Sequence, residues 1–327
     1  MVSRRGFAVT LGLGVLSRPL TARAQRAATV TRVGFLWPGS RLPDPEWPWQ
    51  FLPELRTRGW VEGQNIAIDW RFAEGSADRL NEFATDLVRL RVDAICAVSS
   101  ASVQAAGNAT KTIPIIAIDL ETDPVSKGLA VSLARPRGNV TGLFLDVPEL
   151  TGKWLQLLAE MVPRLSRVAV LWDAALDRTP LRATDVLAQS QGMQLQILEV
   201  RGPSDFNAAF QAATRRRAGA LMVMQSPDLD VHQKLIVELA AASRLPTIAM
   251  FERFVEAGGL AAYGVNLAEL YRVGARFIDK ILRGAKPADL PMERPTRFDF
   301  VVNLRTAKAL GLTIPQSVLM RADRVIR

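Results

Sequence analysis

The sequence contains very few of the side chains that build metal sites and nucleophile–base pairs. Its 327 residues include one cysteine, Cys96, and one histidine, His232. A zinc site needs several such ligands, and a Ser–His–Asp triad needs a histidine placed against its nucleophile. One cysteine allows no internal disulfide, and Cys96 lies in an apolar segment typical of a buried, inert thiol. These absences argue against a hydrolase, and we expect no catalytic activity, no metal and no cofactor.

Nucleotide and nucleic-acid motifs are missing as well. The sequence has no Walker A pattern and no dinucleotide-binding glycine fingerprint. The densest basic run, Arg215–Arg217, has no interleaved aromatic residues and lies beside Gly219, which is typical of a solvated helix end. No apolar run reaches the roughly 18 residues that a membrane span needs. We therefore expect no nucleic-acid partner and no stable insertion into a membrane.

Residues 1–24 have the three-part layout of a secretory signal peptide. Arg4 and Arg5 make its start basic, residues 7–16 are apolar and small, and Ala22 and Ala24 occupy the −3 and −1 positions of a cleavage site. The alternative, a buried N-terminal helix, is disfavoured because the apolar stretch is short and ends at an Arg-Pro pair.

Cleavage after Ala24 predicts a periplasmic protein that begins at Gln25. The removed segment holds four arginines and no acidic residue, so the net charge falls from +9 to +5. The paired arginines before Gly6-Phe7 are similar to a twin-arginine signal, and the general secretory route stays open as the alternative.

The rest of the chain alternates short apolar strands with amphipathic helices. Helical spacing is clear at Leu80, Ala84 and Leu87. Such alternation with short loops indicates parallel sheets and right-handed crossovers, so the chain is predicted to be α/β with two doubly wound lobes. The turn-rich segment Gly138–Gly142 predicts the seam between them. The expected strands are 33–37, 66–70, 93–98, 113–118, 168–172, 195–198, 220–224, 247–251, 260–265 and 298–302.

Several long motifs are similar to those of one protein family. They are Gly59–Asn65 with Asp69–Gly75, Asp123–Leu129 with Ser132–Pro136 and Gly138–Gly142, Phe298–Gly311, and Ser317–Ile326. On these motifs the mature chain resembles the ABC transporter substrate-binding family whose best-known branch binds tryptophan. Arg137 departs from the family's usual glycine, and residues 37–49 are unusually rich in Trp and Pro.

The resemblance implies a type I periplasmic-binding fold, in which two Rossmann-like lobes joined by three crossovers hold a ligand between them. By this analogy the N-terminal lobe is 30–142 plus 264–287, and the C-terminal lobe is 143–263 plus 288–327. The implied function is to capture a small molecule outside the cytoplasmic membrane and deliver it to an ABC importer. The implied partners are ABC permease and ATPase subunits, which must be other chains.

Two other functions stay open at this point. A two-lobed binding protein also serves as a ligand sensor for a membrane receptor, and the sequence does not separate sensing from transport. Some glycosyltransferases have two Rossmann-like lobes as well. The export signal and the lack of a nucleotide-phosphate cluster argue against that enzyme class.

Ligand-binding residues are predicted from strand direction, because open parallel sheets bind ligands beyond the carboxyl ends of their strands. This rule selects the loops that follow the strands, including residues 119–121, and the crossovers add a few more positions. The candidate residues are Trp37, Ser40, Ser99, Ser100, Asp119, Phe144, Trp172, Asp173, Gln225, Ser226, Phe251, Glu252, Tyr263 and Asn266.

Ser99 and Ser100 end a strand and open an alanine-rich helix, whose free N–H groups and dipole favour an anion. We therefore expect a small carboxylate ligand, either an amino acid or an aromatic or organic acid. The alternative for one serine is a simple N-cap. Asp119, Asp173 and Glu252 would neutralise a ligand ammonium or merely cap loops. The aromatic candidates would stack on an aromatic ligand or fill the lobe cores.

Overall fold

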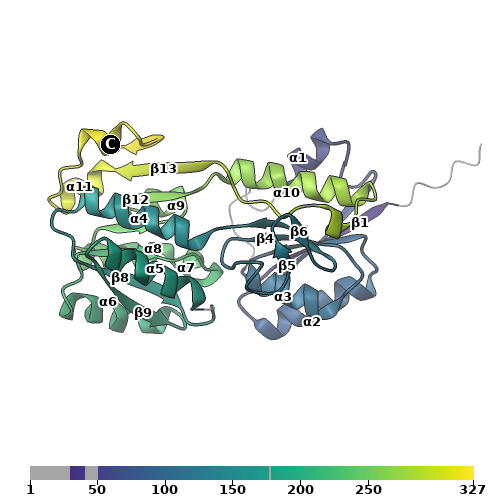
Figure 1. Cartoon of the computed structure of the whole chain (residues 1–327), viewed down its shortest axis with the longest axis horizontal. Coiled ribbons are helices and arrows are strands. Elements are labelled where there is room, and N and C mark those ends of the chain that lie inside the picture. Colours follow the sequence, from purple (N-terminus) through teal and green to yellow (C-terminus); the bar gives the residue numbers. More distant parts are fainter. Residues whose placement is uncertain (1–29, 41–50, 177) are drawn as a thin grey trace, which may run out of the picture.

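The computed structural model describes residues 30–40, 51–176 and 178–327, which form two α/β lobes lying side by side (Figure 1). This agrees with the predicted fold class. The predicted signal peptide, residues 1–24, and most of the Trp- and Pro-rich stretch, residues 41–49, lie outside the described residues. None of the helices in the described ranges is long and apolar enough to cross a membrane.

The first lobe contains a five-stranded parallel sheet with helices on both faces. In spatial order its strands are β2 (Ile66–Phe72), β1 (Thr31–Trp37), β3 (Ala94–Val98), β4 (Ile115–Asp119) and β7 (Val140–Phe144). Successive side chains of a strand point to opposite faces, so Cys96 and Ala97 belong to different cores. The Cys96 face packs against α1 (Phe51–Thr57) and α10 (Leu267–Leu282), and the Ala97 face packs against α2 (Ala77–Arg89) and α3 (Ser100–Ala109). A short antiparallel pair, β5 (Ala130–Ser132) and β6 (Arg135–Pro136), belongs to the same lobe.

The second lobe contains a seven-stranded sheet. In spatial order its strands are β9 (Gln194–Val200), β8 (Arg167–Asp173), β10 (Ala220–Val223), β11 (Thr247–Ala249), β12 (Ala261–Val265), β13 (Phe298–Asn303) and β14 (Arg324–Ile326). The pairing of β12 with β13 is antiparallel, whereas the other pairings in this sheet are parallel. In both lobes the first five strands have the same order: second, first, third, fourth, fifth. This is the strand order of a flavodoxin-like doubly wound sheet.

Helices cover both faces of the second sheet. Trp154 of α4 is fully buried there, and its indole N–H donates to the carbonyl of Tyr263 at 2.6 Å. α4 (Val147–Met161) and α5 (Thr179–Ser190) share one core, and α6 (Phe206–Arg215) and α8 (Gln233–Ala242) share the other. The shorter helices are η1 (Pro203–Asp205), α7 (Pro227–Val231), α9 (Glu252–Glu256), α11 (Leu304–Ala309) and α12 (Gln316–Leu319).

The strands expected from the sequence are all present, with limits that differ by at most two residues. The interpretation of Gly138–Gly142 as a turn is wrong, because Val140–Phe144 forms strand β7, and the first crossing follows this strand. Gly142 has φ +137°, and a Cβ built on it would lie 2.0 Å from the carbonyl oxygen of Ala117 in β4. The glycine therefore serves a close approach between two paired strands rather than a turn.

The chain passes between the lobes three times. Strand β7 ends at Phe144 in the first sheet, and the next helix, α4, packs in the second lobe. Strand β12 ends at Val265 in the second sheet, yet α10 contacts β3, β4 and β7 of the first. The chain stays there through η2 (Pro287–Asp289) to Glu293, which forms an isolated bridge with Leu143. The crossings are therefore 145–146, 266 and 294–297. The first two lie two to four residues after the predicted lobe limits, and the third lies at least seven residues after the limit predicted at 287.

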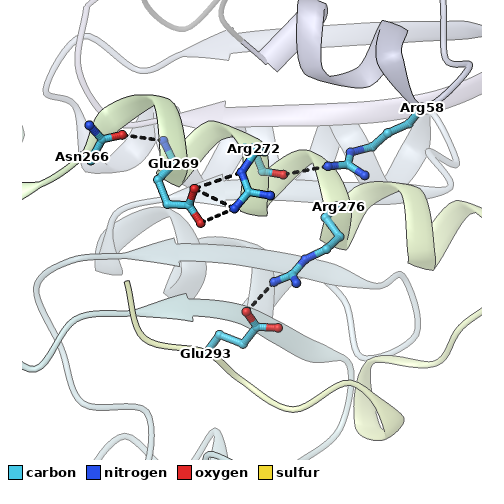
Figure 2. Close-up of polar contacts among 6 residues, drawn as sticks. All are labelled: Arg58, Asn266, Glu269, Arg272, Arg276 and Glu293. Atoms are coloured by element: carbon cyan, nitrogen blue, oxygen red, sulfur yellow. Dashed lines mark hydrogen bonds and ion pairs between the residues drawn. The ribbon is translucent and has the colours of Figure 1, made fainter. Parts of the chain in front are cut away.

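Polar contacts connect α10 and the residue before it to neighbouring segments (Figure 2). The side chain of Asn266 caps the helix by accepting the N–H of Glu269 at 2.8 Å. Its amide also donates to Asp299, at the start of β13 in the second lobe. Farther along the helix, Arg276 forms an ion pair with Glu293. The second and third crossings are thus tied to each other and to α10.

Candidate functional site

A cavity of about 830 Å³ lies at the carboxyl ends of the strands and receives residues from both lobes. Pro38 follows β1 and Ser99 follows β3 in the first lobe, whereas Asp173 ends β8 and Pro227 follows β10 in the second. Strand order reverses between β1 and β3 and again between β8 and β10. In doubly wound sheets this reversal is where ligands bind, and the volume is typical of a small-molecule site.

The start of α3 is built by Ser99 and Ser100. Ser99 has φ +84°, a strained value for a residue other than glycine, and its N–H donates to the carbonyl of Ile118 at 2.9 Å. Its hydroxyl accepts the N–H of Ser102 at 3.4 Å, so Ser99 is the N-cap of the helix. The capping role that the sequence left open for one serine therefore belongs to Ser99.

Ser100 binds an internal carboxylate, that of Glu121. Its N–H donates to Glu121 Oε2 at 3.0 Å, and its hydroxyl donates to the same oxygen at 2.5 Å. A carboxyl group does lie at this helix start, but the chain itself supplies it. The predicted place for a ligand carboxylate is occupied by a side chain that was not among the predicted residues.

The loop 119–121 was selected from the sequence, but Asp119 was chosen from it rather than Glu121. Asp119 is buried and caps its own loop, because Oδ1 accepts the N–H groups of Glu121 and Thr122 and Oδ2 accepts the Thr122 hydroxyl. The two acids are two residues apart at the end of a strand. Side chains two residues apart in a strand point to the same side. The spacing of Asp119 and Glu121 could therefore have indicated Glu121 as well.

Carboxylates from both lobes converge on the cavity. Burial raises the pKa of Glu121, and the charges of Asp119 and Asp173 raise it further. The hydrogen bonds from Ser100 lower it, but by less. Burial also raises the pKa of Asp119, against the hydrogen bonds that it accepts. Burial raises the pKa of Asp228, His232 opposes this shift, and Asp173 adds to it. Asp173 therefore lies close enough to act on an acid of each lobe.

A second cavity, of about 30 Å³, lies beside the first and has room for only one or two waters. Trp37 of the first lobe and Phe251 of the second line it, and both side chains are nearly buried. The guanidinium of Arg253 lies 4.7 Å from the Phe251 ring centroid and 2.6 Å from Asp230. The Gln225 amide also donates to Asp230, at 2.9 Å. The wall of this cavity therefore contains aromatic rings and an ion pair between Arg253 and Asp230.

Half of the predicted residues line these two cavities, namely Trp37, Ser99, Ser100, Asp119, Asp173, Gln225 and Phe251. The other half do not line either one. Ser40 is exposed, and Phe144 and Trp172 are buried in the lobe cores. Within the described chain the indole N–H of Trp172 has no hydrogen-bond partner.

The remaining predicted residues have structural contacts elsewhere. Ser226 caps α7, and Glu252 forms an ion pair with Arg324. Tyr263 stacks on a neighbouring strand's aromatic ring, and Asn266 caps α10 as described above. Among the described residues there is no cluster of His, Cys, Asp and Glu side chains that could hold a metal ion.

Comparison with known proteins gives consistent matches. The family model of ABC transporter substrate binding proteins matches residues 51–326. A tyrosine-binding protein from Clostridioides difficile (strain R20291) is 30% identical over 270 residues, which is 80% of this chain and 75% of the relative. A Vibrio cholerae conserved domain protein superimposes with a TM-score of 0.84 at 24% identity, over 90% of this chain and 99% of the other.

Further solved structures are similar over most of the chain. An ABC domain from Streptococcus pneumonia in complex with L-Trp has a TM-score of 0.82 at 25% identity, and covers 90% of this chain and 99% of its own. A ligand-free, open substrate binding protein from Clostridium difficile has a TM-score of 0.66 at 26% identity, and covers 91% and 99%. At nearly equal identity and coverage, the TM-score is higher for the L-Trp complex than for the open structure. A leucine binding protein from Thermotoga maritima, at 17% identity and a TM-score of 0.56, shows the same type I periplasmic-binding fold.

Proposed function

Because the chain belongs to the family of ABC transporter substrate-binding proteins, we propose that it is an exported, periplasmic protein that binds a small molecule between its two lobes. It then delivers this molecule to the permease and ATPase subunits of an ABC importer. The cavity of about 830 Å³ carries the proposal, because residues at the carboxyl ends of strands in both lobes line it. When the lobes close around a ligand, their outer surfaces change position relative to each other. A permease could therefore distinguish the loaded protein from the empty one.

The ligand proposed is an amino acid or a related small molecule with an amino group. A tyrosine-binding relative and an L-Trp complex support an amino acid. Trp37 and Phe251 line only the smaller cavity, whose volume of about 30 Å³ has no room for an aromatic ring, so they add no support for an aromatic ligand. Glu121 and Asp173 on the larger cavity support an amino group.

Native mass spectrometry of protein purified from the periplasm without refolding tests this proposal. We expect a fraction of the protein to carry the mass of one small molecule, which calorimetry with the purified compound would confirm as a ligand. Protein that carries nothing and binds no compound of a metabolite library would contradict the proposal. Turnover of a nucleotide-sugar would instead support the glycosyltransferase alternative.

Export predicts a defined N-terminus. Ala22 and Ala24 fit the −3 and −1 positions of signal-peptide cleavage, so the mature protein is expected to begin at Gln25. N-terminal sequencing of the protein recovered from the periplasm measures this directly. An exported form that still begins at Met1 would rule out cleavage at this position.

Ligand binding is expected to close the lobes by rotation about the three crossings. The ion pair between Asp146 and Arg294, at 2.5 Å, joins the first crossing to the third, so the crossings move as one hinge. Small-angle scattering should show a smaller radius of gyration at saturating ligand than in protein stripped of ligand by unfolding and refolding. An identical radius in both states would argue against a hinge.

A further inference from the structure

Glu121 occupies an unusual position for a carboxylate, since it lines both cavities and is only 8% exposed. Its Oε2 accepts hydrogen bonds from both the N–H and the hydroxyl of Ser100. In the described part of the chain Oε1 accepts no hydrogen bond. The carboxyl group of Glu121 therefore offers one oxygen to a hydrogen-bond donor of whatever fills the ligand-sized cavity.

Two acids of the opposite lobe line the same cavity. Asp173 ends β8 and accepts the N–H of Ala175 at 2.9 Å, and Asp228 lies on α7 beside His232. Asp173 raises the pKa of both Glu121 and Asp228, so these carboxylates repel one another across the gap between the lobes. A cation placed among them removes this repulsion and favours the closed arrangement.

The basic side chains near the cavities do not fill this role. Lys111 lies beyond the far end of α3, roughly 16 Å along the helix axis from Ser100. Lys127 acts on Asp119, and Arg137 is exposed on the loop after β6. Arg253 of the smaller cavity is paired with its own acid, Asp230.

We propose that Glu121, together with Asp173 and Asp228, binds the cationic amino group of the ligand. The ligand class is therefore organic amines, and a free carboxylate, where the ligand has one, is not held at the start of α3. This inference rests on the proposed function and makes Glu121 the residue that determines specificity. An α-amino acid carries its carboxylate one carbon away from its ammonium, where these acids would repel it, so removal of that carboxylate is expected to preserve or improve binding.

A matched panel of compounds tests the inference by calorimetry on the mature protein. It contains the common amino acids, the amines formed by their decarboxylation, their N-acetyl derivatives, and simple organic acids. We expect the best ligand to carry a free amino group and its decarboxylated form to bind at least as tightly. Its N-acetyl derivative should bind at least 100-fold more weakly.

Glu121→Gln is expected to lower the affinity for the best ligand at least 10-fold, because it keeps an acceptor for Ser100 but removes the charge. Glu82→Gln, on the exposed face of α2, removes the same charge away from the cavity and should leave the affinity unchanged. Thermal unfolding of both variants shows whether each is folded, and Asp173→Asn should weaken binding from the other lobe.

Several results would overturn the inference. An N-acetyl compound or an amine-free acid that binds as tightly as its amine would do so, as would a folded Glu121→Gln protein with unchanged affinity. In these cases the chain still binds a small molecule, and the proposed function stands. If no compound of any class binds and the native protein carries no ligand, the inference and the proposed function both fall.

Discussion

Gly142→Ala is expected to destabilise the protein by roughly 3–6 kcal/mol, a large part of the stability of an ordinary domain. The backbone of Gly142 has φ +137°, which an alanine adopts only with strain. The new Cβ would also lie 2.0 Å from the carbonyl oxygen of Ala117, and this atom belongs to a buried strand that cannot move aside. Urea unfolding followed by circular dichroism measures the loss, and we expect poor yields of folded protein.

Gly192→Ala is the matched control for this prediction. Gly192 also has a positive φ, +74°, but nothing lies within 4 Å of a Cβ placed on it. Only backbone strain of about 1 kcal/mol should then appear. Equal losses in the two variants would show that strand packing at β4 and β7 contributes nothing beyond the backbone angle.

Glu121→Gln is expected to raise the free energy of unfolding by about 1–3 kcal/mol at pH 8, although the same variant should bind ligand more weakly. Burial raises the pKa of Glu121 from 4.5 to about 8, with Asp119 and Asp173 adding to the effect. The folded protein therefore binds this proton more tightly than the unfolded chain does. Stability consequently falls as the pH rises from about 4.5 to about 8, where the buried carboxyl group loses its proton.

Unfolding measured from pH 6 to pH 8.5 isolates this effect, because the raised pKa of Asp119 lies at about 6. The unmodified protein should lose stability with rising pH in that range, and the Gln variant should lose much less. Glu82→Gln serves again as the control, with an unchanged pH dependence. Parallel curves for all three proteins would show that Glu121 ionises normally in the folded state.

A gain in stability together with a loss of affinity would identify a group retained for binding. A structural carboxylate would behave in the opposite way, because a neutral amide oxygen accepts the hydrogen bonds of Ser100 more weakly than a charged carboxylate oxygen does. Glutamine still offers an oxygen to Ser100, so the comparison separates the charge of Glu121 from its hydrogen bonds.

The sequence by itself determined the α/β class, the strands and the family. Hydrophobic period is a local property, so runs such as Val33–Trp37 and Ile248–Phe251 could be recognised without any knowledge of their partners. The rule of carboxyl strand ends also selected Ser99, Ser100, Asp119 and Asp173, which the structure gathers on one cavity.

Only the tertiary structure decided which of those residues face a ligand and which serve the fold. Phe144 is the last residue of β7 and Trp172 the last but one of β8, but both side chains point into the lobe cores. Glu121 emerged as the occupant of the α3 start because the end of β4 lies beside that helix, a contact between residues 21 apart. The sequence suggested a turn at Gly142 because it shows where a glycine occurs but not why. In the structure the reason is a neighbouring strand that leaves no room for a side chain. The local sequence pattern could indicate where the site lies. Burial and the distances between charged groups depend on the whole packed chain, so only the tertiary structure shows which residues face the cavity.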